Sequence, residues 1–289
     1  MTAQTKPFRS LLYIPGSKER ALEKATGLAA DGIIFDLEDA VAVDEKANAR
    51  QLVADTLRNR DYGSRALMVR INGYETDWYK DDLEVICATG PEAILLPKVN
   101  SGPDITWLAN YLENHPACEH TAIWAMMETP LGILNAQEIA AASPRMQGMV
   151  LGTNDLVKDM GARHTPDRAP VMTSLGMCLL AARAYGLICV DGVYNKYQDT
   201  DGLVGYCEQG RDLGFDGKTL IHPAQIYTAN TIFAPSVEDI DLAKRQMAAF
   251  EEAEAKGLGI AVLDGNIVEN LHVEAARRLL AKAAAIGAL

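Results

Sequence analysis

The sequence contains no apolar run that approaches the length of a membrane span, and its first residues, MTAQTKPFRS, lack the apolar core of a secretory signal. Its five cysteines are scattered and form no CxxC pair, which argues against a zinc site or a disulfide framework. Neither a Walker loop nor a glycine-rich dinucleotide fingerprint is present. These absences favour a cytoplasmic protein without a membrane anchor.

Positive charge is also scarce. The 27 Lys and Arg residues are outnumbered by 39 Asp and Glu residues, so the formal net charge is −12. This balance disfavours binding to nucleic acids and to anionic membranes. It is compatible with a small anionic substrate, because a metal ion and a few basic side chains can make one cleft locally positive.

Apolar, strand-like runs and segments of helical periodicity alternate along most of the chain. The eight runs are Ser10–Pro15, Gly32–Leu37, Ala66–Ile71, Ala93–Lys98, Ala122–Glu128, Gly148–Gly152, Leu187–Asp191 and Lys218–Ile221. The helical segments are Lys18–Ala30, Asp44–Arg58, Trp78–Thr89, Pro103–Asn114, Leu131–Ala142, Val171–Tyr185 and Leu203–Leu213. Eight such units predict an α/β fold of the closed (β/α)8 TIM barrel type, with an open doubly wound sheet as the alternative.

The barrel is complete before the chain ends. We therefore expect a catalytic barrel domain over residues 1–230 and a C-terminal lid and oligomerisation extension over residues 231–289. In the extension, Val237–Lys256 and Val273–Ile286 have helical patterns, and Asp264–Gly265 lies between them as the turn of a small β-unit.

Polar residues cluster where the apolar runs end. Two of them are lone carboxylates, Glu128 in AIWAMMETP and Asp155 in GMVLGTNDL. A buried carboxylate is costly unless something neutralises it, and two that share an opening suit a divalent cation with oxygen preference, which favours Mg²⁺. The alternative is that each accepts backbone N–H bonds.

Several motifs together resemble those of the citrate lyase β-subunit-like family within the HpcH/HpaI aldolase superfamily, which includes malyl-CoA, β-methylmalyl-CoA and citramalyl-CoA lyases. They are RSLLYIPGS at 9–17, FDLEDAV at 35–41, VRIN at 69–72, LPKV at 96–99, METP at 127–130, LGTNDL at 151–156, GKTLIHP at 217–223 and LDG at 263–265. The resemblance implies a TIM barrel, Mg²⁺ (with Mn²⁺ as a substitute), an acyl-CoA ligand and a 2-oxoacid. It also implies a homotrimer or homohexamer in which the C-terminal lid covers a neighbour's site.

The same resemblance assigns catalytic roles. Arg70 would hold the oxygens that gain charge when a 3-hydroxyacyl-CoA is cleaved, or else form an ion pair with a barrel carboxylate. Glu38, in the DLED motif, is a candidate base or outer-shell group. Asp264 of a neighbouring subunit would act as acid/base on the acyl-CoA carbon, although Asp-Gly is also a common hairpin turn.

Four further residues are candidates for substrate or CoA binding. Lys18 and Arg20 follow the turn after the first strand, where the family binds CoA and where cations suit its phosphates. Lys98 would hold a carboxylate locally or reach the acyl-CoA, and His222 would line the CoA site or serve a structural role.

These residues predict Mg²⁺-dependent cleavage or formation of a carbon–carbon bond in a 3-hydroxyacyl-CoA, which yields an acyl-CoA and a 2-oxoacid. A (3S)-malyl-CoA thioesterase that uses the same site is one alternative. A citrate lyase β subunit that acts on an acyl carrier protein is another. Two further alternatives are a Schiff-base aldolase that uses Lys98 or Lys218, and a non-catalytic binding protein.

Overall fold

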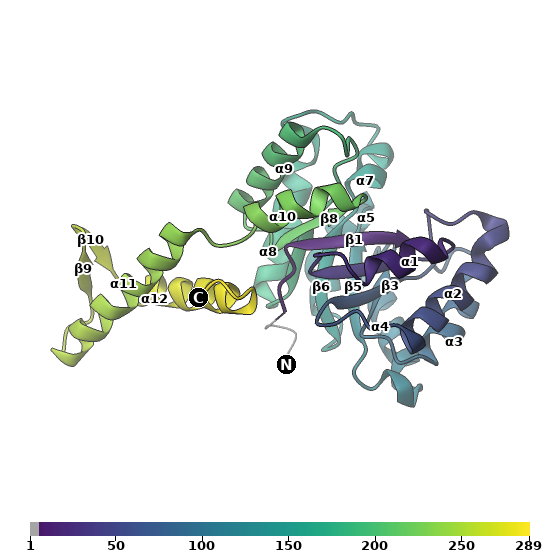
Figure 1. Ribbon diagram of the computed structural model, residues 1–289, viewed down its shortest axis with the longest axis horizontal. Coiled ribbons are helices and arrows are strands. Elements are labelled where there is room, and N and C mark those ends of the chain that lie inside the picture. The colour runs from purple at the N-terminus through teal and green to yellow at the C-terminus, as the bar shows by residue number, and fades with distance from the viewer. Residues whose placement is uncertain (1–5) are drawn as a thin grey trace. The chain divides into compact units, whose positions relative to one another are not determined.

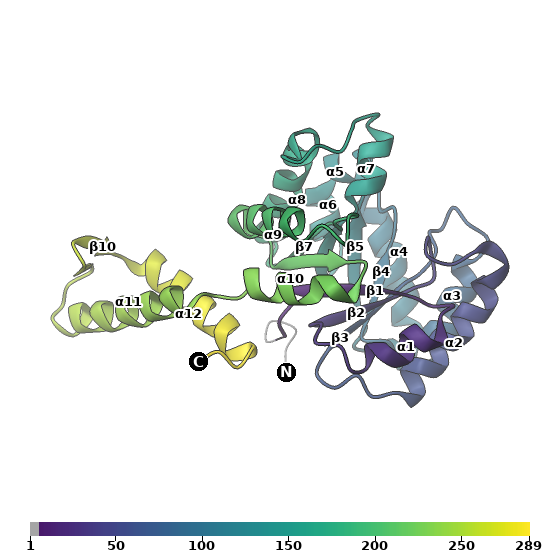
Figure 2. The same cartoon turned by 45° about the horizontal axis from the view of Figure 1, so that its top comes forward.

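Eight parallel strands close into a barrel in the computed structural model, which describes residues 6–289. Figures 1 and 2 show these strands with helices around them. The strands are β1 (Ser10–Pro15), β2 (Gly32–Asp36), β3 (Ala66–Arg70), β4 (Ala93–Leu96), β5 (Ala122–Met127), β6 (Met146–Leu151), β7 (Ile188–Asp191) and β8 (Gly217–Leu220). Pairing between β1 and β8 closes the sheet. The predicted (β/α)8 barrel is therefore confirmed, and the open doubly wound sheet is excluded.

Helices follow the strands in the order expected for this fold. They are α1 (Glu19–Ala25), α2 (Lys46–Asn59), α3 (Tyr79–Cys87), α4 (Gly102–Glu113), α5 (Pro130–Leu134), α6 (Ala136–Ala141), α7 (Thr153–Asp159), α8 (Met172–Ala184), α9 (Thr200–Leu213) and α10 (Ile226–Ile232). The single helix predicted over Leu131–Ala142 is in fact two, which meet at Asn135. Helices α7 and α10 were not predicted.

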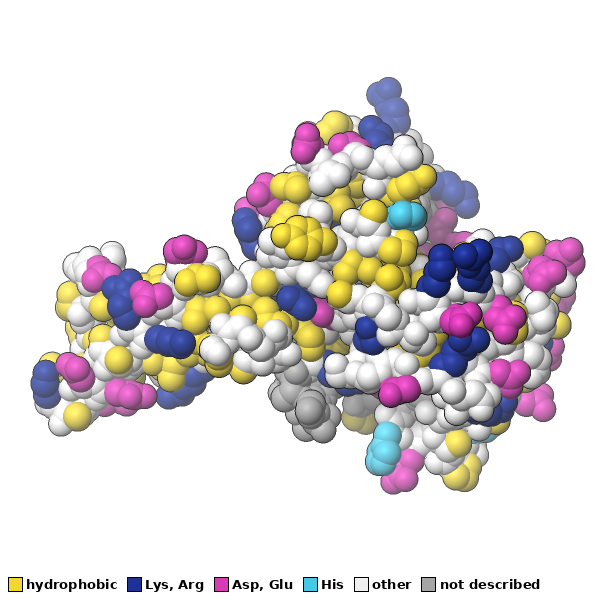
Figure 3. Space-filling view, in the orientation of Figure 1, with side chains coloured by type: hydrophobic (Ala, Val, Ile, Leu, Met, Phe, Trp, Pro, Cys, Tyr) yellow, Lys and Arg dark blue, Asp and Glu magenta, His cyan; other side chains and the backbone are white. Residues whose placement is uncertain are grey.

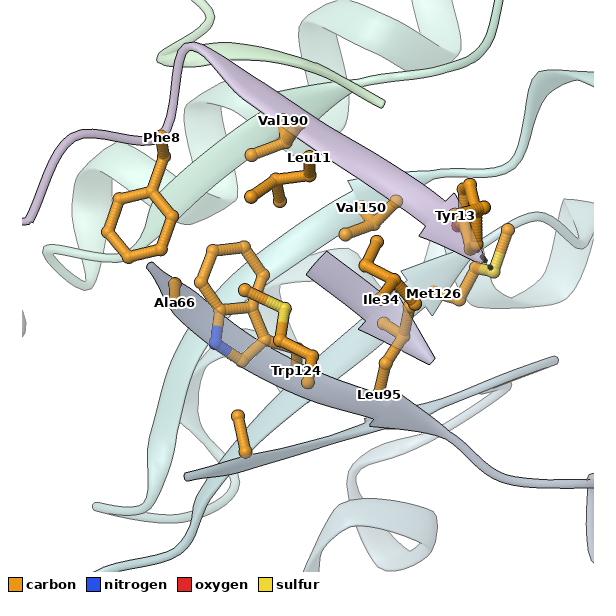
Figure 4. Close-up of a cluster of buried hydrophobic side chains, with 12 residues drawn as sticks. Phe8, Leu11, Tyr13, Ile34, Ala66, Leu95, Trp124, Met126, Val150 and Val190 are labelled. Atoms are coloured by element: carbon orange, nitrogen blue, oxygen red, sulfur yellow. Dashed lines mark hydrogen bonds between the residues drawn. The ribbon is translucent and has the colours of Figure 1, made fainter. Parts of the chain in front are cut away.

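Alternate side chains of strands β1 to β7 fill the barrel interior. Figure 4 shows this cluster, with Phe8 and Trp124 toward one end and Tyr13 and Met126 toward the other. Gly148 provides the space for the Trp124 ring, because a Cβ at that position would lie 2.5 Å from it. Since strand side chains alternate in direction, the polar residues that end the inward-facing series lie above this core.

The chain divides into two compact units. One is formed by residues 8–230, and the other by residues 231–289 with Lys6 and Pro7. The second contains α11 (Val237–Ala255), a hairpin of β9 (Ala261–Leu263) and β10 (Asn266–Val268), and α12 (Asn270–Ala285). Its small core consists of Phe250, Ala253, Ala261, Val268 and Val273. The predicted turn is confirmed, and both of its residues, Asp264 and Gly265, have positive φ.

The five cysteines are all buried and free, so they serve as small core residues, as the absence of a CxxC pair in the sequence allows. Among residues 6–289, no helix combines the length and the apolar character that crossing a membrane requires.

Candidate active site

A cleft of about 300 Å³ opens at the C-terminal ends of the barrel strands. Arg70, Glu128 and Asp155 all line it, so three residues predicted from separate motifs meet in one place. Arg70 ends β3, and Glu128 directly follows β5. Asp155 lies in the first turn of α7 rather than at a strand end. Catalytic sites of TIM barrels occupy this end of the fold.

The sequence METP fixes the position of Glu128. Strand β5 ends at Met127, and Thr129 begins helix α5 as its N-cap, with its hydroxyl accepting a bond from Gly132 N–H at 3.0 Å. Pro130 occupies the first helical position, where its missing N–H costs nothing. Glu128 is therefore held between a rigid strand and a capped helix.

The carboxylate of Glu128 is buried and only partly satisfied. One oxygen, Oε1, accepts the Lys98 backbone N–H at 2.8 Å, and no donor within residues 6–289 reaches the other. Burial and the nearby Glu38 charge raise the pKa of Glu128 to about 8, against an opposing effect of Arg70. The alternative reading, a buried carboxylate that accepts backbone N–H bonds, therefore holds for one oxygen of Glu128 and leaves the other for a ligand.

A divalent cation fits this pair of carboxylates. Asp155 is half-buried, lines the same cleft and further raises the Glu128 pKa through its charge. Residues 6–289 contain no group of three or more His, Cys, Asp or Glu side chains placed to hold a metal. Two carboxylates beside an open cleft match Mg²⁺, which is usually held by one or two carboxylates plus water and substrate oxygens.

Gly152 makes room for Glu128. A Cβ at this position would lie 2.4 Å from Glu128 Cβ and 2.6 Å from its Oε2. The backbone of Gly152 has φ −98°, which any residue can adopt, so the requirement is for space alone. Sequence reasoning missed this role, although the glycine of LGTNDL is visible in the motif.

Arg70 is held by carboxylates from the end of β2. Its Nε and Nη2 donate to the two oxygens of Asp36 at 2.7 and 2.5 Å, and Nη1 lies 2.9 Å from Glu38 Oε2. Burial acts to lower the Arg70 pKa, but Asp36, Tyr13 and Glu38 together outweigh it and raise the pKa further above its usual value. Arg70 therefore forms an ion pair with barrel carboxylates and also lines the cleft, so it presents a fixed positive charge to a ligand.

Glu38 joins Arg70 to Lys98. Its Oε1 accepts a hydrogen bond from Lys98 Nζ at 2.7 Å. Burial raises the pKa of Glu38, and the two cations oppose that shift. Lys98 has a left-handed backbone with φ +50°, which is uncommon for a residue other than glycine. This conformation places its N–H on Glu128 while its side chain reaches Glu38, so one residue links both carboxylates.

Two residues that sequence reasoning did not select complete the surroundings. The Tyr13 ring lies 4.9 Å from Arg70 Cζ, and its hydroxyl contacts Met126 Sδ at 3.8 Å. Lys46 is buried, and its Nζ donates to the backbone carbonyls of Leu37 and Glu38 at 2.8 and 2.7 Å. The strand alternation that places Leu11 inside the barrel could have identified Tyr13, whereas Lys46 gives no such signal.

A comparison of this chain with known families matches residues 9–223 to the HpcH/HpaI aldolase/citrate lyase model. The chain belongs to the HpcH/HpaI aldolase/citrate lyase family. Over 288 residues it is 59% identical to a (3S)-malyl-CoA thioesterase of Cereibacter sphaeroides, covering 100% of this chain and 99% of the relative. It is 37% identical over 277 residues to the citrate lyase subunit beta of Leuconostoc mesenteroides subsp. cremoris, covering 94% and 92%.

The solved structures of the HpcH/HpaI family give the same fold. The Mycobacterium tuberculosis protein CitE, in complex with magnesium, acetoacetate and coenzyme A, superposes with a TM-score of 0.81 at 31% identity. That match covers 97% of this chain and 99% of CitE.

Four predicted ligand-binding residues of this HpcH/HpaI chain lie outside the cleft lining: Lys98, described above, and three exposed residues. Lys18 and Arg20 are exposed at the start of α1. His222 is exposed after β8, where its ring stacks on Tyr197 with centroids 4.6 Å apart and its Nδ1 accepts the Ala224 N–H. Their proposed contact with CoA stays a prediction.

Asp264 belongs to the C-terminal unit. It is exposed, occupies the β9–β10 turn with φ +48°, and forms an ion pair with Arg245 of α11. Its role in a neighbour's site stays a prediction.

Lys218, one of the two Schiff-base candidates, is fully buried. Its Nζ donates to Asp191 Oδ2 at 2.7 Å and to Gly192 O at 2.6 Å. A nucleophilic lysine needs a free, accessible amine, so this geometry argues against Lys218. The other candidate, Lys98, is hydrogen-bonded to Glu38, which raises the pKa of its ammonium although burial alone would lower it. Neither lysine is arranged for imine formation.

Proposed function

We propose that this protein is a Mg²⁺-dependent enzyme that acts on a 3-hydroxyacyl-CoA of the malyl-CoA type, and that its net reaction is thioester hydrolysis. The observation that carries the proposal is the cleft in which Glu128, Asp155 and Arg70 meet. The similarity to (3S)-malyl-CoA thioesterases spans the whole chain and supports hydrolysis as the outcome. Carbon–carbon cleavage is the second candidate, supported by relatives named citrate lyase subunit beta.

In this scheme, Glu128 and Asp155 hold the metal, and bound Mg²⁺ would supply charge stabilisation to the hydroxyl and carboxylate end of the substrate. Arg70, fixed by Asp36, offers guanidinium N–H groups to an oxygen that gains charge. Glu38 and Lys98 keep Arg70 and Glu128 in place. In hydrolysis, water adds to the thioester carbon, the carbon–sulfur bond breaks, and the sulfur takes up a proton to give malate and CoA thiol.

The products decide between the two candidates. The purified chain would be incubated with (3S)-malyl-CoA and Mg²⁺, and free thiol, malate, glyoxylate and acetyl-CoA would be followed together. Hydrolysis gives equal amounts of thiol and malate, whereas carbon–carbon cleavage gives glyoxylate and acetyl-CoA without thiol. We expect activity to disappear in EDTA and to return with Mg²⁺. Full activity in EDTA would contradict the proposal.

A neighbouring copy is part of this proposal. The C-terminal unit exposes large apolar side chains, among them Val262, Ile267 and Leu271, which are 68%, 56% and 59% exposed. Figure 3 shows hydrophobic side chains at the surface of this unit. Such a surface on a small unit favours contact with another chain. We propose that residues 231–289 cover the cleft of a neighbour in a homotrimer or homohexamer, where Asp264 serves as the acid/base group.

Mixing two inactive variants tests this arrangement. Glu128→Gln removes a metal ligand from the chain that carries the cleft, and Asp264→Asn removes the carboxylate from the chain that carries the lid. Co-expressed in equal amounts, the two would form some sites with both residues intact, so we expect activity to return partially. No recovery in co-assembled oligomers, with each variant folded, would show that Asp264 does not act across the interface.

A further inference from the structure

A second cavity lies beside the metal cleft. Its volume is about 230 Å³, and its wall is built by the segment that follows α7, the loop after β7 and helix α9. Thr153 and Val193 line both this cavity and the metal cleft, so the two spaces adjoin. The catalytic scheme proposed above makes no use of it.

The wall of this cavity is strongly biased in charge. Arg163, Arg168 and Lys196 contribute cationic groups and His164 contributes its imidazole ring, whereas no Asp or Glu in the described part of the chain lines the cavity. This contrasts with the overall net charge of −12. Arg163, His164 and Lys196 are exposed, so their polar ends are accessible to a ligand. A concave surface with cationic groups and no carboxylate concentrates anions.

A buried cluster of two basic side chains and one carboxylate lies behind this wall. Arg168 and Lys218 both pair with Asp191, and all three side chains are at least nine-tenths buried. One carboxylate therefore faces two basic side chains, and burial lowers the pKa of the Lys218 amine although Asp191 opposes that shift. One carboxylate cannot balance both basic groups when they are charged, and an anion in the adjoining cavity would favour their charged forms.

Arg168 links the buried cluster to the cavity. Its backbone has φ +59°, in the left-handed region that residues other than glycine rarely adopt. Its guanidinium carbon lies 5.0 Å from the centre of the Tyr206 ring, which also lines the cavity. The ring and Asp191 thus hold the guanidinium in the wall, as preorganised anion sites require.

Two acidic side chains of the same loops are already engaged. Asp167 accepts hydrogen bonds from the Thr165 hydroxyl and the Ala169 N–H. Asp199 accepts from the Tyr194 hydroxyl at 2.5 Å and from the Gly202 N–H at 3.0 Å. Neither carboxylate lines the cavity to neutralise it.

We propose that this cavity is a subsite for a small oxyanion, a carboxylate or phosphate group. Two sources can deliver that group. It can be the far carboxylate of a dicarboxylic oxoacid whose other end occupies the metal cleft, because the two spaces adjoin, or it can be a separate anion. Only the first source rests on the function proposed above, because it uses the same Mg²⁺ cleft, and it extends the ligands of that cleft from glyoxylate to dicarboxylic oxoacids.

Calorimetric titration of the full-length chain tests the subsite. The probes are inorganic phosphate without Mg²⁺, and 2-oxoglutarate against 2-oxobutyrate with Mg²⁺, since these two oxoacids differ by one terminal carboxylate. The test variant is Arg163→Gln/His164→Gln/Lys196→Gln, which changes exposed residues only. A control, Arg58→Gln/Arg211→Gln/Lys256→Gln, removes exposed charges elsewhere.

If the subsite binds a separate anion, phosphate should bind without Mg²⁺. The test variant should bind it roughly tenfold more weakly than the parent, and the control should bind it as the parent does. If the subsite binds a substrate carboxylate, 2-oxoglutarate should bind more tightly than 2-oxobutyrate. Only the test variant should lose this difference in affinity between the two oxoacids. Either result supports the subsite. If both titrations are the same in all three proteins, the subsite is refuted. If the chain binds phosphate but does not turn over malyl-CoA, the proposed function is overturned and the subsite is not.

Discussion

Gly152→Ala is the sharpest test of the metal cleft. The added Cβ would lie 2.4 Å from Glu128 Cβ, whereas carbon atoms in contact normally lie about 3.5–4.0 Å apart. The overlap exceeds roughly 1 Å, and Glu128 cannot yield easily because its strand and the Lys98 N–H hold it. We expect the carboxylate to move by about 1 Å, a displacement that can cost about 10²-fold in rate.

The variant should also lose stability. Overpacking of a buried position typically costs about 1–3 kcal/mol. Calorimetry would measure the Mg²⁺ affinity, turnover of malyl-CoA would give kcat/KM, and urea unfolding would give the stability. Gly205→Ala in α9 is the matched control, because a Cβ there meets nothing within 4 Å. That control should gain about 0.5–1 kcal/mol, as Ala does over Gly in a helix. Parent-like Mg²⁺ affinity and turnover in Gly152→Ala would refute the placement of Glu128 as a metal ligand.

Three further changes address other parts of the site. Glu128→Gln keeps the side-chain shape but removes its charge, so Mg²⁺ binding should fall below detection by calorimetry, and unchanged affinity would exclude Glu128 as a ligand. Lys218→Met should lower the free energy of unfolding by about 3 kcal/mol, because the buried oxygens of Asp191 and Gly192 each lose the Nζ donor. Borohydride with pyruvate should label neither the parent nor this variant, and a labelled parent would revive the Schiff-base alternative. Lys46→Met should lower kcat roughly tenfold with Mg²⁺ affinity retained, because it supports the backbone beside Glu38 rather than the metal; parallel loss of both would indicate general disruption.

The sequence was sufficient to predict the barrel because its strands carry a direct signal. Strand β1 spans the predicted residues, and most of the others differ from prediction by one or two residues at an end. Continuous apolar runs mark buried parallel strands, whatever packs around them. Helix α7 was missed because GTNDL reads as a turn, although Asp155 lies within that helix.

The residues of the candidate site could be predicted from the sequence, but the bonds between them could not. Glu128, Asp155 and Arg70 stand out as polar residues after apolar runs, and strand order brings them together. The bond between Arg70 and Asp36 depends on the register of β2 and β3, which no local pattern reports. The left-handed backbone of Lys98 is set by the loop around it rather than by its own preference.

The paired charges of Asp36 and Arg70 also form the top of the barrel interior, next to Tyr13. Exchange of a buried ion pair for well-packed apolar residues is often neutral or stabilising. Heat resistance and turnover therefore make opposite demands on this layer. Selection for thermal stability alone could replace Asp36 and Arg70 with apolar residues, whereas selection for activity has to retain them.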